Sequence, residues 1–264
     1  MPGTLTVLTA VNTWECDEND HMNVQFYAQK FDTALAAMGQ EIGTQRFRLL
    51  RYHRELRAGE AIRVLSQPVT LADGRNALCH RMDVTDDGAL SATALDIGLG
   101  AGGPLPPESA LPRGGIDDAE NLEADDGAEI TYRGIIAAAD LTPQGRISSK
   151  ALVGCFSDAA PAAWTLAGMS TTWLKARNLG RVAMEMSLSF GTPPQAGDTV
   201  TVHTSMVSRA EKTKTYRHRM TNDRTGAVVV VGRATSLAIS YDDRRAIVIP
   251  EDARAAIDAR LRRL

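Results

Sequence analysis

A short segment near the N-terminus combines ionisable side chains with the start of a helix-like apolar pattern. Residues 14–31 read WECDENDHMNVQFYAQKF, and the ionisable side chains include Asp17, Glu18, Asp20 and His21. A carboxylate can activate water or attack an electrophile, and an imidazole can transfer protons. A helix that begins directly after these side chains offers free backbone N–H groups and a positive dipole end, which suit a developing oxyanion. The segment therefore predicts acid–base or nucleophilic chemistry at a helix N-terminus.

The same side chains could instead form a metal site, support a different nucleophile or build a purely structural turn. The Asp17-x-x-Asp20 spacing matches no EF-hand loop and the chain has no His-x-x-x-His pair, so we predict no metal site. A Ser-His-Asp triad lacks support, because no G-x-S-x-G motif is present. In a structural turn, Asp17 would be a solvated loop carboxylate, His21 would bond to backbone and Asn23 would cap the helix.

Two long helices are predicted, one in each half of the chain. The first begins at Val24 and continues to Met38, with apolar residues at i, i+3, i+4 and i+7. The second covers Leu152 to Trp164 with the same spacing. The candidate N-cap residues are Asp20 or Asn23 for the first helix and Ser148 or Ser149 for the second.

Each predicted helix precedes a segment with β alternation, and these two segments are similar to each other. A constant offset of 138 residues aligns Gly59 with Gly197, and the triplet His80-Arg81-Met82 with His218-Arg219-Met220. Both segments alternate in the manner of TVTVHTSMV and contain turns with Gly. We therefore predict a duplicated unit of one strand, one long helix and about four antiparallel strands, with the helix covering the apolar face of the sheet.

The composition changes sharply at residues 98–129, where Gly, Pro and acidic residues dominate without apolar periodicity. Such a segment is typical of a solvated linker. We therefore divide the chain into a first repeat at 1–99, a linker at 100–128, a second repeat at 129–248 and a C-terminal helix at 249–264. The predicted fold class is α+β.

The overall composition is that of a globular protein without a global basic field. The net charge is −3, so we predict no nucleic-acid partner. No stretch approaches the roughly 20 apolar residues that span a bilayer, and the N-terminal MPGTLTVLTAV lacks the pattern of a signal peptide. Cys16, Cys79 and Cys155 are an odd number without metal spacing, which fits a reducing compartment. We expect a cytoplasmic protein that does not associate with membranes.

The residues before the first helix also match a known signature. The pattern W-x-x-D-x-x-x-H-x-N-x-x-x-Y is formed by Trp14, Asp17, His21, Asn23 and Tyr27. It resembles the Asp-x-x-Gly-His-x-Asn-Asn-x-x-Tyr motif of 4-hydroxybenzoyl-CoA-thioesterase-like hotdog proteins, although Asp20 replaces the Gly and Val24 the second Asn. The resemblance implies a double hotdog, in which two repeats each wrap an antiparallel sheet around a long central helix. The two sheets would pair edge to edge.

The same resemblance implies an acyl-CoA thioesterase, which hydrolyses a CoA thioester to free acid and CoA. Asp17 would be the base or nucleophile, and the backbone N–H at Val24 or its neighbour would polarise the thioester carbonyl. Asn23 would orient water or the acyl group, and His21 would order the turn. The open alternatives are an acyl-carrier-protein thioesterase, a non-catalytic acyl-CoA-binding module and a hotdog dehydratase. Related dehydratases usually separate Asp and His by five positions with a Pro between them, whereas here the separation is four without Pro.

No cofactor is expected beyond the coenzyme A that forms part of the substrate. Coenzyme A carries several phosphate charges, and the basic segment SRAEKTKTYRHR could bind them through Arg209, Lys212 and Lys214. Arg146, before the second helix, is a further candidate. The alternative for the basic segment is a solvated sheet edge, kept from pairing by its lysines. The acyl-CoA is the predicted small-molecule partner, and a homodimer of double-hotdog chains is compatible with the prediction.

The segment before the second helix lacks the carboxylate of the first. When DENDHMNVQFY is aligned with TPQGRISSKAL, Thr142 takes the place of Asp17. A threonine hydroxyl without a neighbouring base cannot replace the carboxylate. We therefore predict one catalytic centre in each chain. A different register, with Asp140 or Asp158 as a second carboxylate, would give two.

Overall fold

The computed structural model describes residues 3–17, 19–100, 102–106 and 128–261. The elements of the first half are β1 (Thr4–Ala10), a 3-10 helix (Thr13–Glu15), α1 (Val24–Ala37), β2 (Phe47–Tyr52), β3 (Ala61–Thr70), β4 (Asn76–Val84), β5 (Leu90–Ile97) and β6 (Gly103–Pro104). Those of the second half are β7 (Glu129–Ile135), a 3-10 helix (Ala138–Asp140), α2 (Ser149–Leu166), α3 (Thr171–Lys175), β8 (Leu179–Phe190), β9 (Thr199–Arg209), β10 (Thr213–Asn222), β11 (Val228–Ser240), β12 (Arg245–Ala246) and α4 (Glu251–Asp258).

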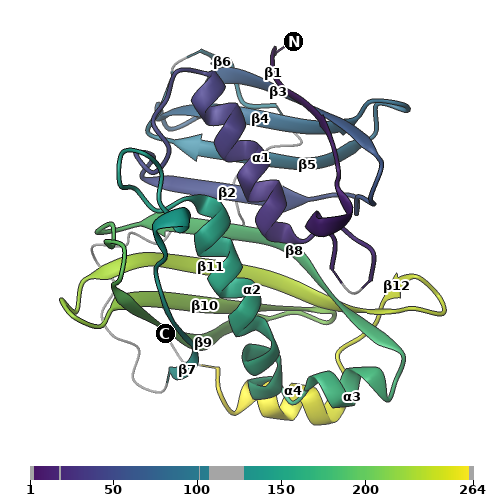
Figure 1. The fold of residues 1–264 in the computed structure, drawn as a ribbon. Coiled ribbons are helices and arrows are strands. Elements are labelled where there is room, and N and C mark those ends of the chain that lie inside the picture. The colour runs from purple at the N-terminus through teal and green to yellow at the C-terminus, as the bar shows by residue number, and fades with distance from the viewer. Residues whose placement is uncertain (1–2, 18, 101, 107–127, 262–264) are drawn as a thin grey trace.

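The strands of both halves form one continuous, largely antiparallel sheet (Figure 1). Its order is β1-β3-β4-β5-β2-β8-β11-β10-β9-β7, with β12 beside β11 and the short β6 parallel to β3. The two halves meet where β2 pairs with β8, and Leu49 lies opposite Ser187 in that pair. These two residues are separated by the same 138 positions that align the two halves in sequence. The β2–β8 pair therefore lies on a pseudo-twofold axis, from which corresponding strands run outward to both edges.

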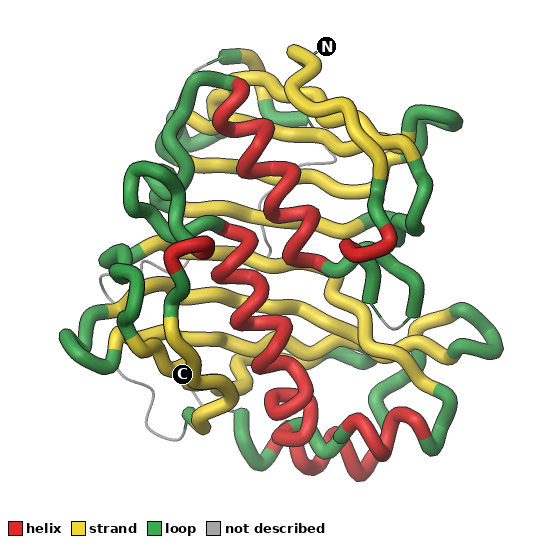
Figure 2. Tube along the Cα trace, in the orientation of Figure 1, coloured by secondary structure: helices red, strands yellow, loops and turns green. Residues whose placement is uncertain are grey.

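The helices α1 and α2 lie side by side on one face of this sheet (Figure 2). The side chain of Asn23 accepts a hydrogen bond from the Gln25 N–H, and that of Ser148 accepts one from the Ala151 N–H. Each is an N-cap of the kind that the sequence indicates. The predicted helices are confirmed, as is the succession of one strand, one long helix and four antiparallel strands in each half.

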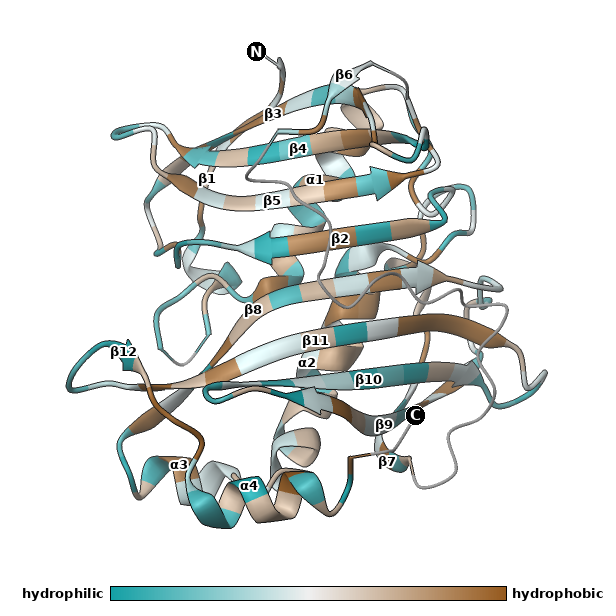
Figure 3. Cartoon of the chain, turned by 180° about the vertical axis from the view of Figure 1, so that it is seen from behind, coloured by the Kyte–Doolittle hydropathy of each residue, from teal (hydrophilic) through white to brown (hydrophobic). Residues whose placement is uncertain are grey.

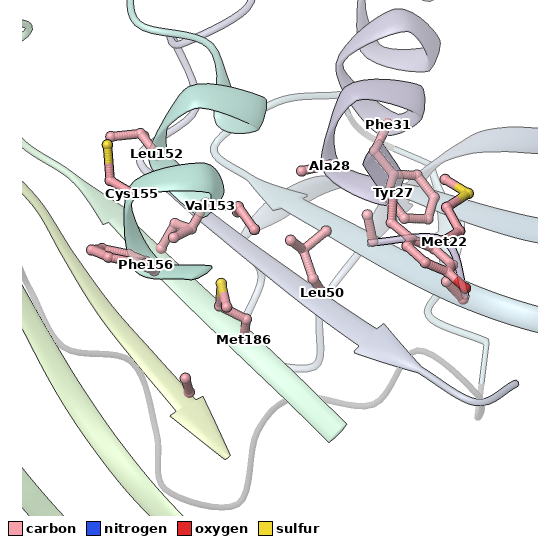
Figure 4. Packing of buried hydrophobic residues seen from close by; sticks show 14 of the residues in the cluster. Met22, Tyr27, Ala28, Phe31, Leu50, Leu152, Val153, Cys155, Phe156 and Met186 are labelled. Atoms are coloured by element: carbon pink, nitrogen blue, oxygen red, sulfur yellow. The ribbon is translucent and has the colours of Figure 1, made fainter. Parts of the chain in front are cut away.

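The main hydrophobic core lies between the two helices and the sheet (Figure 4). Phe31 of α1 and Leu50 of β2 belong to the same cluster as Phe156 of α2 and Met186 of β8. Burial of a side chain of this kind contributes about 1.5–3 kcal/mol relative to leaving it exposed. Because both halves supply the cluster, they share one core.

The opposite face of the sheet carries a smaller apolar cluster in the first half (Figure 3). It includes Phe47, Leu49 and Ile97, and Leu105 packs against it. Beside this contact, β6 pairs with β3. Residues 103–105 were expected in the solvated linker, but the apolar cluster gives Leu105 a surface to cover, so the chain stays on the sheet here. Residues 107–127 of the predicted linker lie outside the described residues.

A further apolar cluster lies at the end of α2. Trp164 of α2 and Leu174 of α3 pack there with Ile257 of α4. The sequence did not predict α3, because a helix of one turn is too short to show an apolar period. The helix α4 lies within the predicted C-terminal helix. None of the described helices is long and apolar enough to cross a membrane.

Candidate active site

The turn at residues 16–22 holds the Asp17 carboxylate directly before α1. The Asp17 N–H donates to the backbone oxygen of His21 at 2.8 Å. One carboxylate oxygen, Oδ1, accepts the N–H of Asn19 at 2.8 Å and that of His21 at 3.2 Å. No donor among the described residues binds the other oxygen, Oδ2. The turn therefore orients the carboxylate through Oδ1 and leaves Oδ2 available for chemistry.

The N-terminus of α1 places a free backbone N–H in the same region. The Asn23 side chain accepts the Gln25 N–H at 3.1 Å, and its backbone oxygen accepts the Phe26 N–H at 2.9 Å. Within the described part of the chain, no acceptor is bonded to the Val24 N–H. A free N–H at the positive end of a helix dipole can stabilise an oxyanion.

The imidazole of His21 takes part in a separate group of contacts. Its Nε2 lies 3.3 Å from the Glu55 carboxylate and 3.2 Å from the Arg57 guanidinium. The contact of His21 with the Asp17 carboxylate is made by its backbone N–H. The role of His21 in ordering the turn stays a prediction.

Asp17, Asn23 and Val24 all line one cavity of about 1000 Å³. The second half of the chain supplies much of its wall, including Phe156 of α2 and Met186 of β8. The Tyr241 hydroxyl, from the segment after β11, donates to the Asn19 side chain at 2.7 Å and ties the second half to the turn. The cavity is therefore completed by both halves together.

Polar side chains of β10 and β11 also line this cavity, and sequence reasoning gave them no role. His218 stacks on Phe156 at 4.9 Å between ring centroids, and its Nδ1 lies 2.7 Å from the Thr204 hydroxyl. Burial lowers the pKa of His218 to about 4, so it is neutral at pH 7. Tyr216 and Ser236 line the same cavity. The sequence did contain a signal for these residues, because Tyr216 and His218 stand at alternate positions of β10 and therefore lie on the same face of the sheet.

The turn at residues 141–147, before α2, repeats the backbone of the first turn. The Thr142 N–H donates to the backbone oxygen of Arg146 at 2.7 Å, as Asp17 does to His21. Gly145 has a φ of +75°, and Asp20 has a φ of +60° at the corresponding position. The structure therefore confirms the register in which Thr142 corresponds to Asp17.

The second turn lacks both features described for the first turn. Thr142 provides no carboxylate, and the Ser149 N–H, which corresponds to that of Val24, donates to the Asp32 carboxylate at 2.8 Å. The cavity beside this turn is smaller, at about 460 Å³. Asp140 holds the preceding turn, because its Oδ2 accepts the Ala137 N–H at 2.8 Å. Asp158 lines the larger cavity instead.

The structure does not gather the four predicted phosphate-binding residues at one place. Arg209 forms an ion pair with Asp258 at 2.5 Å, and Lys212 is exposed in the turn between β9 and β10. Lys214 is only 1% exposed, so it cannot meet a phosphate at the surface. Arg146 lies at the second turn, 3.8 Å from Glu41. Among the described residues, no group of three or more His, Cys, Asp or Glu side chains is placed to hold a metal ion.

Comparison with known proteins gives the same picture of the fold. A family model described as the thioesterase-like superfamily matches residues 137–257. No curated protein matches the sequence. A crystal structure of a putative oleoyl thioesterase from Lactobacillus plantarum is similar, with a TM-score of 0.61 and 14% identity over 89% of this chain and 96% of that chain. A 12:0-ACP thioesterase from Umbellularia californica has a TM-score of 0.62 and 10% identity over 88% of this chain and 93% of that chain.

A third similar structure is an acyl-ACP thioesterase from Bacteroides thetaiotaomicron, with a TM-score of 0.55 and 10% identity. It covers 87% of this chain and 96% of that chain. At these identities the similarity shows the shared fold. All three matches extend over both halves of this chain, so the fold similarity includes the way in which the halves are joined.

Proposed function

Residues 137–257 match the thioesterase-like superfamily, and the chain shares its fold with solved thioesterases. From this premise we propose that it hydrolyses acyl-CoA thioesters. One observation carries the proposal. Asp17 and Val24 line the same cavity at the start of α1, and among the described residues one carboxylate oxygen of Asp17 and the N–H of Val24 have no partner. Hydrolysis of a thioester needs such a pair, a base or nucleophile beside an oxyanion donor.

In the proposed reaction, the thioester carbonyl binds with its oxygen at the Val24 N–H. The positive end of the α1 dipole stabilises the negative charge that forms on this oxygen. Asp17 either removes a proton from a water that attacks the carbonyl carbon, or attacks this carbon itself and forms an acyl anhydride that water then hydrolyses. In both cases the C–S bond breaks, coenzyme A leaves as the thiolate and takes up a proton, and the free acid is released. Asn23 keeps its side chain on the Gln25 N–H and so holds the helix N-terminus in place.

We interpret the arrangement as a double hotdog, in which one chain takes the place of two subunits. The pairing of β2 with β8 about a pseudo-twofold axis supports this interpretation. A symmetric pair of subunits presents two equivalent turns, and here only the first turn keeps a carboxylate and a free N–H. We therefore propose a single catalytic centre in each chain.

The direct test of the function is turnover of a panel of acyl-CoA substrates, monitored as release of the free thiol. The same acyl groups on acyl carrier protein form the second arm of the panel. Faster turnover of the CoA series supports the proposal, and faster turnover of the carrier-protein series assigns the enzyme to acyl carrier protein. Binding of acyl-CoA without turnover of either series would make the chain a binding module.

The Val24 N–H can be removed with little change in shape, because Val24 is the first residue of α1. Proline is well tolerated at this helix position, and Asn23 already has φ −64° and ψ 141°, which suit a residue before proline. We expect Val24→Pro to lower kcat about 10²-fold, since one oxyanion donor is lost. Steady-state kinetics with the best substrate of the panel measure this effect.

The matched control is Val24→Ala, which keeps the N–H and removes most of the side chain. We expect it to retain kcat within a few-fold. If both variants lose activity equally, the Val24 side chain matters and its N–H does not. Circular dichroism of both variants checks that α1 is intact.

Titration with a mechanism-based acyl-CoA analogue should give one reactive site per chain. Asp17→Asn should abolish this labelling, whereas Asp140→Asn should keep it, because the Asp140 carboxylate accepts the Ala137 N–H and so holds the turn that precedes the second turn. A stoichiometry of two, or half of the labelling left in the Asp17 variant, would contradict the single-centre proposal.

A further inference from the structure

The cavity that contains Asp17 continues to a polar region on the inner face of the second half. Arg181 of β8, Tyr216 of β10 and Ser236 of β11 line the cavity there. Lys214 pairs with Ser236 across the β10–β11 ladder, and so lies on the same face. We call Arg181, Lys214, Tyr216 and Ser236 the polar quartet.

Lys214, Tyr216 and Ser236 are buried and Arg181 is half-buried, and three of the four side chains have unused hydrogen-bonding atoms. Tyr216 is 2% exposed and Ser236 is 6% exposed. Among the described residues, no partner is bonded to Nη1 of Arg181, to the Tyr216 hydroxyl or to the Ser236 hydroxyl. A buried polar group without a partner costs about 1–3 kcal/mol, so these atoms are placed to bind something that enters the cavity.

The quartet also holds two basic side chains without a neighbouring acid. The ammonium group of Lys214 lies 3.0 Å from the centroid of the Trp164 ring. Within the described part of the chain, neither Lys214 nor Arg181 forms an ion pair with a carboxylate. Burial, together with the Arg181 charge, lowers the pKa of Lys214 to about 6. An anion in this region would restore the charged form of Lys214 and bind both cations.

The cavity also has apolar lining residues beside the polar quartet. Phe156, Met186 and Ala234 line it, and Ala234 pairs with Tyr216 across the β10–β11 ladder. Such a lining suits the methylene groups of an acyl chain, and the quartet suits a charged group at the far end of that chain. A carboxylate can use several donors at once, including the fork of an Arg guanidinium.

We infer that the acyl group of the substrate ends in a carboxylate, which binds to Arg181, Lys214, Tyr216 and Ser236. This inference rests on the proposed function, because it names the substrate class of the same cavity. The substrates are then monothioesters of dicarboxylic acids, and the reaction releases the dicarboxylic acid and coenzyme A. The phosphates of coenzyme A are the other possible source of anionic groups, and the test separates the two.

The test compares alkanoyl-CoA esters with ω-carboxyalkanoyl-CoA esters of the same chain length, using the whole chain. We expect kcat/KM to be at least about tenfold higher for the ω-carboxy series, because charge-assisted hydrogen bonds to the terminal group are gained. Tyr216→Phe and Ser236→Ala remove one hydroxyl each with little change in shape. Each should reduce the ratio between the two series several-fold.

Lys214→Met should reduce the same ratio about tenfold, and Arg217→Met is its matched control. Arg217 is on the same strand, but its side chain is on the opposite face because successive residues alternate. Equal or faster turnover of the alkanoyl series by the unmodified protein would overturn the inference and leave the proposed function intact. A weaker affinity of Lys214→Met for free coenzyme A would also overturn it, since the quartet would then bind the CoA portion.

Absence of turnover in both series would count against the proposed function, and binding then decides the inference separately. Thioether analogues of both series cannot be hydrolysed, so their dissociation constants can be measured by calorimetry. At least tenfold tighter binding of the ω-carboxy analogue supports the inference. Equal binding of the two analogues overturns it.

Discussion

Replacement of Asp17 by Asn is expected to reduce kcat about 10³-fold, with little change in substrate affinity. The amide keeps an oxygen in the Oδ1 position, where it can accept the N–H groups of Asn19 and His21. The turn should therefore keep its shape. What is lost is the negative charge at Oδ2, and with it the ability to activate water or attack the carbonyl. Steady-state kinetics and binding of a thioether analogue measure the two quantities separately.

Asp158→Asn is the matched control, because Asp158 is another carboxylate that lines the same cavity. It lies on α2 and is exposed, so we expect the variant to keep most of the activity. The opposite result, with Asp158→Asn inactive and Asp17→Asn within threefold of the unmodified protein, would move the catalytic role to α2. A loss in both variants would mean that the two carboxylates act together.

The sequence predicted the elements that carry the site, because their signals are local. Asn23 and Ser148 are N-cap residues next to an apolar stripe of helical period, and the structure places both at helix N-termini. The strands after each helix alternate in a way that only a half-buried sheet explains. The correspondence of Thr142 with Asp17 was also visible in the alignment of the two segments, and the structure agrees, since Asp20 and Gly145 have a positive φ at the same place.

The sequence could not predict which side chains meet across the two halves. Lys214 was grouped with its neighbours in sequence, Arg209 and Lys212, as part of a basic surface. The pleat of β10 turns Lys214 inward, onto Trp164 of a helix 50 residues earlier in the chain. Likewise, the hydrogen bond of the Ser149 N–H to Asp32 joins residues 117 positions apart. Contacts of this kind depend on how the two halves pack together, so no local sequence pattern can predict them.

A buried ionic cluster in the first half accounts for much of the difference between the two halves. Arg48 is fully buried and bonds to both oxygens of Asp96, at 2.6 and 2.8 Å. Its remaining nitrogen, Nη1, bonds to Asp32 at 2.5 Å and to Ser149 at 2.9 Å. Burial works to raise the pKa of Asp96, but the charge of Arg48 and the hydrogen bonds from His80 and Arg48 together outweigh it, so the pKa of Asp96 lies below its usual value. Asp96 is thus the ionised partner of Arg48.

The corresponding positions of the second half are small or apolar. The offsets that align the two halves match Arg48 with Met186, Asp96 with Ala234 and Asp32 with Ser157. Met186, Ala234 and Ser157 all line the larger cavity. The ionic cluster therefore fills, in the first half, the space that is open in the second half. This filling gives a structural reason for the single acyl site that we propose.

Replacement of Arg48 by Met is expected to lower the free energy of unfolding by about 3–5 kcal/mol, because two buried carboxylates lose their cation. For a chain of this length the melting temperature should fall by about 10 °C.

The informative comparison is the triple variant Arg48→Met, Asp32→Ser, Asp96→Ala, which copies the second half at all three positions. It removes the acids together with the base, so no unpaired charge stays buried, and apolar substitution of a whole buried ionic group is often neutral or stabilising. We expect the triple variant to regain at least half of the loss, as measured by urea unfolding. A triple variant that is less stable than Arg48→Met alone would contradict this explanation. The cluster would then stabilise the fold through its hydrogen bonds and packing, and the unpaired charges of Asp32 and Asp96 would not be the cause of the loss in Arg48→Met.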